Sequence, residues 1–346
     1  MILEIKMNNK EYQVIIERGI LNKSSSYLSA NSLDIKNRKT LILTDDGIPV
    51  QYVDILKENI ANQNNDNVFV YTIKQGEESK SFANYSSIID YLIDNEFTRT
   101  DCVIALGGGV VGDLAGFVSA TYMRGIAFYN IPTTLLAQVD SSIGGKTAID
   151  KKGYKNLVGA FYPPEKVLID PNVLSTLDKR QFMAGLVEAL KMGLTSDKEL
   201  YELIKNSNNI YKDIDTVIEK ALLVKKDVVE KDPHEKHLRK ILNFGHTIGH
   251  AIESSGKFNL LHGECVGIGL LYMTPVNLQN EIKDVLVKYN LPTKESIANT
   301  ITNDDLFKYI SLDKKRSNKD ITIVEVKEPG TFEINKISLD EIKNYL

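Results

Sequence analysis

The alternation of short β-branched runs with helical periodicity in the first half of the chain constrains the fold most. Strands that alternate with helices form a parallel sheet whose faces the helices cover. The sequence therefore predicts a Rossmann-like α/β domain. The predicted strands are 40–44, 67–73, 102–106 and 167–169, and the predicted helices between them are 50–62 and 81–95.

Three prolines, Pro163, Pro164 and Pro171, mark the end of this alternation, and beyond them the periodicity is almost wholly helical. We therefore expect an α/β domain over residues 1–173 and an all-helical, or mainly helical, domain over 174–346. The predicted helices of the second domain are 179–194, 198–206, 215–231, 244–254 and 264–279, and its only predicted strand is 321–326.

Composition excludes several classes of protein. Lys and Arg number 42 against 46 Asp and Glu, which gives 42 − 46 = −4, so no basic excess favours nucleic acid as a partner. Cys102 and Cys265 form no CxxC pattern, which indicates a reducing compartment. Glu4 and Lys6 interrupt the apolar stretch that a signal peptide needs. We expect a cytoplasmic protein with neither a membrane nor a nucleic-acid partner.

A glycine-rich turn follows the strand predicted at 102–106. Gly107, Gly109 and Gly112 satisfy GxGxxG, a turn that lets backbone N–H groups at a helix N-terminus approach a pyrophosphate. In other proteins such glycines only allow a strand and a helix to pack closely. The motif alone therefore leaves open whether the turn binds a pyrophosphate or has a purely structural role. In an ordinary dinucleotide-binding domain this turn follows the first strand, whereas here it follows at least two earlier predicted strands. Asp45, at the end of one of those earlier strands, is therefore the better candidate for a ribose ligand.

The sequence Gly144–Thr147, GGKT, is similar to the end of a P-loop, but the glycine required five positions before Gly145 is Asp140. The P-loop interpretation therefore fails. Lys146 remains a cation in a glycine turn, either solvated or directed at a phosphate or hydroxyl.

The histidines indicate a metal site more specifically than the glycine turns indicate a phosphate site. His246 and His250 are four residues apart, on one face of a predicted helix, and His262 begins the next apolar segment. Glu188 lies on another predicted helix among apolar residues. Two imidazoles and one carboxylate are the ligands of an open catalytic zinc site. The spacing leaves open which two histidines bind the metal.

Five cations stand beside small, apolar or amide residues, a context suited to binding a small anion. For any single one, a solvated side chain is the alternative. They are Arg124, Lys155, Lys191, Lys225 and Arg239.

Longer motifs then identify a family. The segments GGGVVGDLAGFVSATYMRGI, IPTTLLAQVDSSIGGKTAID, KNLVGAFYPP, GLVEALKMG, RKILNFGHTIGHAIE and HGE together resemble the 3-dehydroquinate synthase family of sugar-phosphate cyclases. The resemblance implies a carbon–oxygen lyase of the shikimate pathway, which makes aromatic amino acids. Its reaction converts 3-deoxy-D-arabino-heptulosonate 7-phosphate to 3-dehydroquinate and phosphate. The implied steps are transient oxidation by NAD at C5, β-elimination of phosphate, re-reduction, ring opening and aldol closure.

The resemblance also implies the cofactors and the residues that contact them. It implies tightly held NAD, one divalent metal (Zn²⁺ or Co²⁺) and a homodimer. The implied metal ligands are Glu188, His246 and His262. The implied NAD contacts are Asp45, Glu77, Lys80, Gly109, Val110, Val111, Gly112, Asp113, Thr133, Thr134, Lys155 and Thr176, with Asp140 and Lys146 where the cofactor and substrate sites meet.

The implied substrate contacts are mainly cations and amides. They are Lys146, Lys155, Asn156, Lys191, Lys225, Arg239, Asn243 and His250, together with Arg124, which reaches the phosphate in its own or the neighbouring subunit, and one of Lys314 and Lys315.

Three other functions compete with this interpretation. A polyol dehydrogenase of the same design would release NADH and would not need the cations around Lys155, Lys191 and Arg239. A 2-deoxy-scyllo-inosose synthase would share the mechanism but act on a substrate without a carboxylate. A non-catalytic nucleotide-binding module would not need Glu188, His246 and His262.

Overall fold

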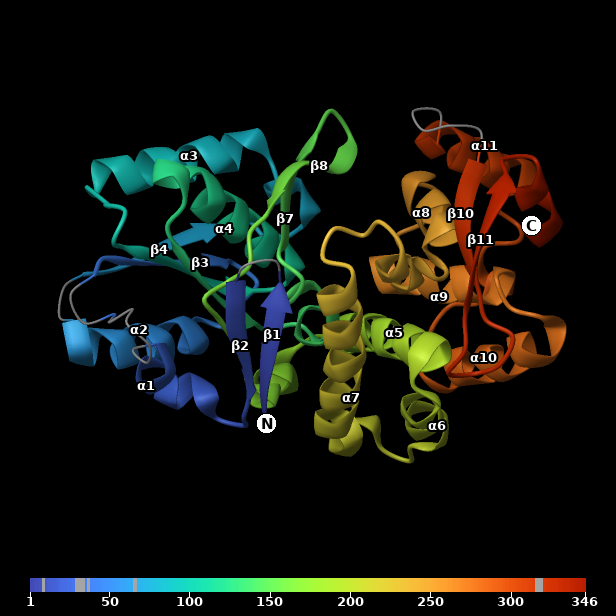
Figure 1. Ribbon diagram of the computed structural model, residues 1–346, viewed down its shortest axis with the longest axis horizontal. Coiled ribbons are helices and arrows are strands. Elements are labelled where there is room, and N and C mark those ends of the chain that lie inside the picture. Colours follow the sequence, from blue (N-terminus) through green and yellow to red (C-terminus); the bar gives the residue numbers. More distant parts are fainter. Residues whose placement is uncertain (8–9, 29–34, 36–37, 65–66, 315–319) are drawn as a thin grey trace. The chain divides into compact units, whose positions relative to one another are not determined.

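The computed structural model describes residues 1–7, 10–28, 35, 38–64, 67–314 and 320–346 (Figure 1). The chain forms two compact units, Met1–Leu177 and Asp178–Leu346, and each is described separately below. The sequence predicts the boundary at residues 173/174, near this division. The side chains of Lys314 and Lys315, one of which is expected to contact phosphate, lie outside the described part of the chain.

A seven-stranded sheet forms the centre of the N-terminal unit. Its strand order is β1-β2-β9-β6-β5-β3-β4. The strands from β2 to β4 run parallel, and only the edge strand β1 pairs antiparallel. The bounds are β1 Ile2–Met7, β2 Lys10–Ile16, β3 Thr40–Asp45, β4 Val68–Ile73, β5 Cys102–Gly107, β6 Ala127–Pro132 and β9 Lys166–Ile169.

Helices cover both faces of this sheet (Figure 1). α1 (Ser24–Leu28) and α2 (Val50–Asn64) pack on one face, where Leu28, Leu56 and Ile60 are fully buried against Ile42 and Ile104. α3 (Phe82–Asp94) and α4 (Gly109–Thr121) pack on the other face through a second apolar cluster. Both faces of the central strands are therefore buried, which explains why β3 and β5 are apolar throughout rather than alternating.

The order of the strands fixes where this unit can bind a ligand. From β3 the chain moves outward to β4, and from β5 it moves in the opposite direction to β6. The carboxyl ends of the neighbouring strands β3 and β5 are therefore the topological switch point, the place where open α/β sheets bind ligands.

Two strands form a separate antiparallel ribbon beside α4. They are β7 (Lys146–Lys151) and β8 (Tyr154–Phe161). The short helices of this unit are η1 Ile20–Lys23, η3 Glu77–Ser79, η4 Tyr122–Arg124, the π-helical turn η5 Ala137–Ser141 and η6 Pro171–Thr176.

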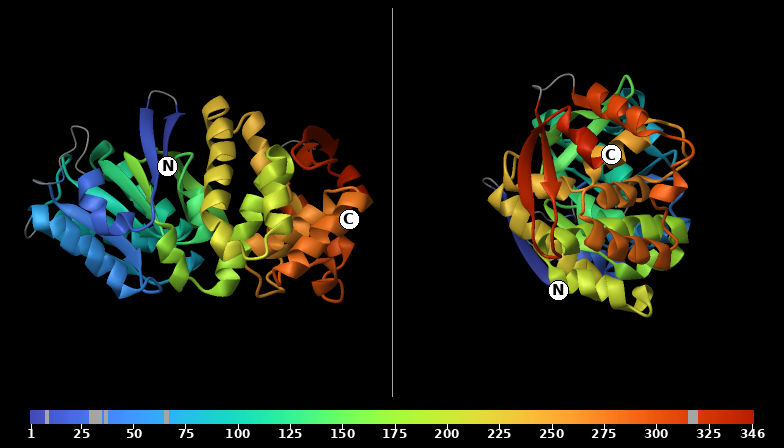
Figure 2. Two further views of the ribbon diagram at one scale, coloured as in Figure 1. Left: turned by 90° about the horizontal axis from the view of Figure 1, so that it is seen from below. Right: turned by 90° about the vertical axis from the view of Figure 1, so that its right-hand side faces the viewer.

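Helices form most of the C-terminal unit. They are α5 Lys179–Ser196, α6 Lys198–Asn206, α7 Ile210–Lys231, η7 Leu238–Asn243, α8 His246–Ser254, α9 His262–Tyr272, α10 Val276–Lys288, η8 Lys294–Ser296, α11 Asn303–Lys314 and η9 Glu341–Tyr345. An antiparallel hairpin, β10 (Asp320–Glu325) and β11 (Glu333–Ser338), accompanies them and is the red ribbon in the right-hand view of Figure 2. Among the described helices, none is both long and apolar enough to span a bilayer.

The predicted strands and helices of the first half are confirmed within about two residues of their ends, and the α/β-plus-helical architecture is confirmed with them. Two other predictions are wrong. Residues 264–279 form two helices rather than one, because Pro275, which cannot donate a helical hydrogen bond, begins a new helix there. The strand predicted at 321–326 is present as β10, but it is not the only strand of the second unit, since it pairs with β11, whose side chains are largely exposed and lack an apolar pattern.

Close packing of helices through glycine shapes the C-terminal unit. A Cβ atom placed on Gly269 of α9 would lie 2.0 Å from the carbonyl oxygen of Gly245, which precedes α8. A Cβ on Gly263 would lie 2.0 Å from the carbonyl oxygen of Ala184 on α5. The backbones of α8, α9 and α5 therefore approach one another more closely than any side chain would permit.

We expect Gly269→Ala to destabilise the protein by about 1–3 kcal/mol or more, because the new methyl group would force two backbones apart. Gly267→Ala is the matched control on the same helix, since its Cβ would meet side chains rather than backbone: Leu286 at 3.3 Å and Val187 at 3.6 Å. The control should change stability by less than about 1 kcal/mol. Chemical denaturation of both variants measures this difference, and equal stabilities would contradict the packing argument.

Candidate active site

Helix α5 carries a buried ion pair at the centre of the candidate site. Glu188 and Lys191 are one turn apart and each is about 1% exposed, and the ammonium of Lys191 donates a hydrogen bond to Oε2 of Glu188. The other carboxylate oxygen, Oε1, is also buried, and within the described residues it has no hydrogen-bond partner. A buried polar atom without a partner costs free energy, so this oxygen indicates a missing ligand.

Two imidazoles face this oxygen. Nε2 of His246, at the start of α8, lies 3.9 Å from Oε1, and Nε2 of His262, at the start of α9, lies 3.7 Å from it. Nδ1 of His246 lies 3.1 Å from the carbonyl oxygen of Phe244, and Nδ1 of His262 lies 3.2 Å from Oε2 of Glu253. A carbonyl and an ionised carboxylate only accept hydrogen bonds, so each Nδ1 carries a proton, and the neutral form of each ring directs the Nε2 lone pair toward Glu188.

This arrangement fits a divalent metal. Ligand atoms around a tetrahedral ion with bonds of about 2.1 Å lie roughly 3.4 Å apart, close to the separations of Oε1 from the two Nε2 atoms. The third imidazole, that of His250, is exposed, with its ring centroid 5.2 Å from that of His246 and 5.6 Å from that of His262. The three histidines also form a loose cluster of possible ligands, with their nitrogens within 4.8 Å of one another. The bridging position of Glu188 favours Glu188, His246 and His262 as the ligands.

Local charges affect the two imidazoles differently. Burial and the nearby Lys191 ammonium hold the pKa of His246 well below its usual value, so this imidazole stays neutral and able to bind a metal. Burial also lowers the pKa of His262, but the hydrogen bond to Glu253 and the charge of Glu188 outweigh it, and the net pKa is raised. A metal at this site would displace a proton from His262 more than from His246.

The backbone that carries His262 is held by a second ion pair. Nε and Nη2 of Arg180 donate to the two carboxylate oxygens of Glu264, both at 2.7 Å. The same carboxylate accepts a hydrogen bond from the backbone N–H of Leu261, at 2.8 Å. This bidentate pair fixes the first turn of α9, where His262 lies.

The cations of the C-terminal unit lie on neighbouring elements. Lys225 of α7 and Arg239 of η7 are 5% and 2% exposed, and Nη1 of Arg239 donates to the carbonyl oxygen of Pro233 at 2.8 Å. Nδ2 of Asn243, at the end of η7, donates to Oε1 of Glu235 at 2.5 Å. Both α7 and η7 pack against α5, the helix that carries Glu188. Buried cations in this position are suited to an anionic ligand.

In the N-terminal unit, Lys80 connects three of the predicted site residues. Its ammonium is buried and donates to Oδ2 of Asp113 at 2.8 Å and to Oδ1 of Asn156, and it lies 3.5 Å from Oε1 of Glu77. Burial lowers the pKa of Lys80, but Asp113 and Glu77 outweigh it, and the net pKa is raised. The lysine therefore stays charged and joins α4, through Asp113, to the β7–β8 ribbon, through Asn156.

The switch point of the sheet carries the predicted dinucleotide residues. Asp45 ends β3, is 8% exposed and accepts a hydrogen bond from the N–H of Gly47, and burial raises its pKa. The glycine turn joins β5 to α4, and a Cβ on Gly107 would meet Val111 at 2.6 Å. The hydroxyls of Thr44 and Thr133 are buried and have no hydrogen-bond partner among the described residues. These unsatisfied hydroxyls and the backbone N–H groups at the N-terminus of α4 fit a dinucleotide.

The remaining predicted residues are spread over this unit. Thr134 accepts a hydrogen bond from the N–H of Ala137, and Thr176 shares one with Tyr52. Asp140 lies in η5, Lys146 begins β7, and Lys155 and Arg124 are exposed on β8 and η4. Val110, Val111 and Gly112 lie in the first turn of α4 with Gly109.

Sequence reasoning missed two residues of interest. Glu253 contacts His262, and its position seven residues after His246, on the same helix face, was a signal that could have revealed it. Thr44 directly precedes Asp45 in the strand and gave no signal, because its hydroxyl is noticeable only once its burial is known.

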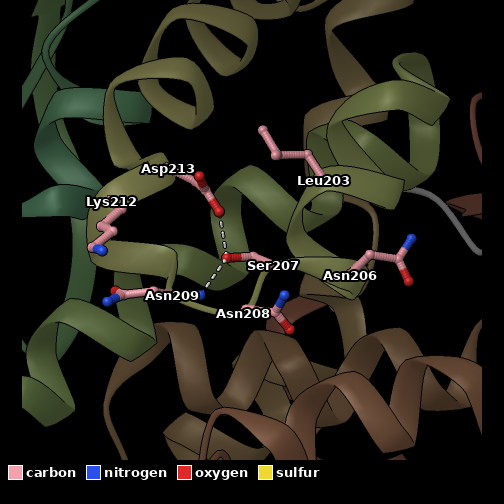
Figure 3. A pocket seen from close by; sticks show the side chains of 7 residues that line it. All are labelled: Leu203, Asn206, Ser207, Asn208, Asn209, Lys212 and Asp213. Carbon is pink, nitrogen blue, oxygen red and sulfur yellow. Dashed lines mark hydrogen bonds between the residues drawn. The ribbon is translucent and has the colours of Figure 1, made fainter.

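A surface hollow at the α6–α7 turn is unrelated to this chemistry (Figure 3). The hydroxyl of Ser207 donates to Asp213 at 2.6 Å and accepts from the N–H of Asn209 at 3.2 Å. The side chain of Asn209 caps α7 by accepting from the N–H of Tyr211. These polar groups close the turn and stabilise the helix N-terminus.

Comparisons with known proteins agree with this geometry. Residues 70–184 match the family model described as 3-dehydroquinate synthase N-terminal, and residues 185–316 match the one described as 3-dehydroquinate synthase C-terminal. The chain is 40% identical to the 3-dehydroquinate synthase of Clostridium botulinum, over 99% of both chains. It is 39% identical to that of Streptococcus thermophilus, also over 99% of both.

Solved structures are similar over the whole chain. A 2-deoxy-scyllo-inosose synthase, solved with carbaglucose-6-phosphate, NAD⁺ and Co²⁺, has a TM-score of 0.87 at 25% identity and covers 100% of both chains. A 2-epi-5-epi-valiolone synthase from Streptomyces hygroscopicus, with NAD⁺ and Zn²⁺ bound, shares the fold with a TM-score of 0.83 at 24% identity, over 98% of this chain and 97% of that one. A butanol dehydrogenase from Thermotoga maritima shares the fold more distantly, with a TM-score of 0.66 at 14% identity, over 96% of this chain and 95% of that one.

We expect Glu188→Ala, His246→Ala and His262→Ala each to lose most of the bound divalent metal, because each removes one of three converging donors. His250→Ala should keep nearly the full metal content. Elemental analysis of the purified variants measures this. If His250→Ala lost its metal and Glu188→Ala kept it, the three histidines rather than Glu188 and two histidines would be the ligands.

Proposed function

Because the chain belongs to the 3-dehydroquinate synthase family, we propose that it converts 3-deoxy-D-arabino-heptulosonate 7-phosphate to 3-dehydroquinate and phosphate. The full-length similarity at 40% identity supports this activity over that of the more distant cyclases, which are about 25% identical. The overall reaction eliminates phosphate and closes a carbocycle, so the proposed enzyme is a carbon–oxygen lyase without net redox change.

The proposed enzyme uses NAD and one divalent metal, Zn²⁺ or Co²⁺. When bound, NAD supplies a reversible hydride acceptor, and the metal polarises the alcohol that is oxidised. The observation that carries the metal assignment is the buried Oε1 of Glu188, which faces Nε2 of His246 and of His262 and has no hydrogen-bond partner within the described residues. In this assignment Lys191 neutralises Oε2 of the same carboxylate.

We propose that NAD binds at the switch point of the sheet and is also contacted by residues of neighbouring segments. Backbone N–H groups at the start of α4 would bind the pyrophosphate, and Asp45 would accept hydrogen bonds from a ribose. The buried Thr133 hydroxyl would gain a partner. The further proposed contacts are Glu77, Lys80, Gly109–Asp113, Thr134, Asp140, Lys146, Lys155 and Thr176.

The proposed substrate contacts match its two anionic groups. A carboxylate and a phosphate both require cations at fixed geometry, and buried Lys191, Lys225 and Arg239 are such cations. Lys146, Lys155, Asn156, Asn243 and His250 would bind the hydroxyls and the remaining charge. Arg124 would reach the phosphate, either within its own subunit or across a homodimer. We place this homodimer in the cytoplasm.

We expect phosphate release over many turnovers with only trace NAD, while net NADH stays near zero, because the hydride removed at C5 must return to the same substrate. A deuterium label at C5 should survive into 3-dehydroquinate. Parallel assays of phosphate and of absorbance at the NADH band measure the two quantities. Stoichiometric NADH, or loss of the label to solvent, would contradict the proposal and indicate a dehydrogenase.

Removing the metal with a chelator should abolish this turnover, and adding Co²⁺ or Zn²⁺ back should restore it, because the metal polarises the C5 alcohol. Elemental analysis must accompany the assay. Full activity in demonstrably metal-free protein would contradict the assignment.

We expect Arg239→Ala to lower kcat/KM for the natural substrate by about 10- to 100-fold relative to its effect on an analogue that lacks the carboxylate. A charge-assisted hydrogen bond contributes about 1.5–3 kcal/mol, which corresponds to this range. Arg239 also contacts Pro233, so thermal unfolding of the variant must be measured alongside. Equal losses with both compounds would show that Arg239 serves the fold or another group.

A further inference from the structure

We propose that Glu253 is a positioning residue that sets the orientation and basicity of the metal ligand His262. The inference rests on the proposed metal site and goes beyond it, because Glu253 does not face the metal position. Its Oε2 lies 3.2 Å from Nδ1 of His262, while Nε2 on the opposite side of the same ring faces Glu188. The imidazole is thus held between two carboxylates, one at each nitrogen.

The fold places Glu253 where it can do this. It lies on α8 seven residues after His246, nearly two turns along the same face, and α8 packs closely against α9. Its side chain is only 18% exposed, so the hydrogen bond to His262 is largely shielded from water. A charge-assisted hydrogen bond is stronger in such surroundings than at the surface.

The two histidine ligands differ in how their rings are held. His246 donates from Nδ1 to the backbone carbonyl of Phe244, a group that every sequence with this fold would provide. The partner of His262 is a side chain, so it depends on the residue at one position. Arg180 and Glu264 fix the backbone of His262, but a fixed backbone still lets the ring rotate about its side-chain bonds.

A carboxylate at Nδ1 has two effects on a metal ligand. It accepts a hydrogen bond but cannot donate one, so it holds the proton on Nδ1 and leaves the Nε2 lone pair for the metal. Its negative charge also makes Nε2 more basic. Loss of such a partner lowers metal affinity by about 10- to 100-fold.

The experiment compares Co²⁺-loaded full-length wild type with Glu253→Ala and Glu253→Gln. A competing chelator measures the affinity for Co²⁺, and the visible absorption of the bound ion reports its coordination. We expect Glu253→Ala to weaken binding by about 10- to 100-fold and to shift the spectrum. Glu253→Gln, which keeps an acceptor oxygen without the charge, should lose less affinity, and it remains informative if the alanine variant fails to fold.

Glu281→Ala is the matched control. Glu281 of α10 accepts hydrogen bonds from Lys205 and Tyr201 of α6, so its loss removes an ion pair that does not involve the histidines and is more exposed, with Glu281 itself 49% exposed. This variant should lose thermal stability without any change in Co²⁺ affinity or spectrum. An effect of Glu253→Ala that merely reflects lost stability would appear in the control as well.

Glu188→Ala separates the failure of this inference from failure of the metal site. If Glu188→Ala loses Co²⁺ while both folded Glu253 variants keep the affinity and spectrum of the wild type, the positioning inference is wrong and the metal site stands. If Glu188→Ala also keeps wild-type binding, the proposed metal site itself is wrong, and the inference falls with it.

Discussion

The close approach of α8 and α9 is the constraint on which the candidate metal site depends. Gly269 lies against the carbonyl of Gly245 with no room for a side chain, and Gly263 lies in the same way against Ala184 of α5. These contacts bring the first residues of α8 and α9 to the buried face of α5. His246 and His262 therefore reach the same carboxylate oxygen although they are sixteen residues apart. Backbone packing, rather than attraction between the side chains, sets this geometry.

The electrostatics of the site follow from burial around Glu188. A buried carboxylate is costly unless it is paired, and Lys191 pairs only one of its two oxygens. The other oxygen is left to the imidazoles, and the same lysine helps keep His246 neutral by lowering its pKa. A divalent cation would compensate the remaining negative charge.

The N-terminal unit also contains a buried charge that is paired with several partners. Lys80 is buried between Asp113, Glu77 and Asn156, so one cation links the helix that follows the glycine turn to the β7–β8 ribbon. Removal of any partner would leave a buried charge with fewer hydrogen bonds. The proposed cofactor contact at Asp113 and the proposed substrate contact at Asn156 are therefore held by a shared side chain.

The sequence by itself determined the alternation of β3, β4 and β5 with α2 and α3 and the mainly helical character of the second half, because apolar strands and amphipathic helices are visible in single segments. It also determined which residue types could bind a metal, and the motifs identified the family that the full-length comparisons then showed. It missed the β1–β2 hairpin, although β1 and β2 are as long as β3 and β5, and it continued one helix through Pro275, although a proline inside a helical pattern is itself a signal of a break.

Only the tertiary structure decided what depends on contacts between distant segments. The spacing of His246, His250 and His262 is equally consistent with several ligand pairs. The position of Glu188, on a different helix, distinguishes them because its buried Oε1 lies 3.9 Å from Nε2 of His246 and 3.7 Å from Nε2 of His262. The contact of Glu253 with His262 depends in the same way on the packing of α8 against α9. No local pattern carries such information, since side-chain separation across two helices is set by the packing between them.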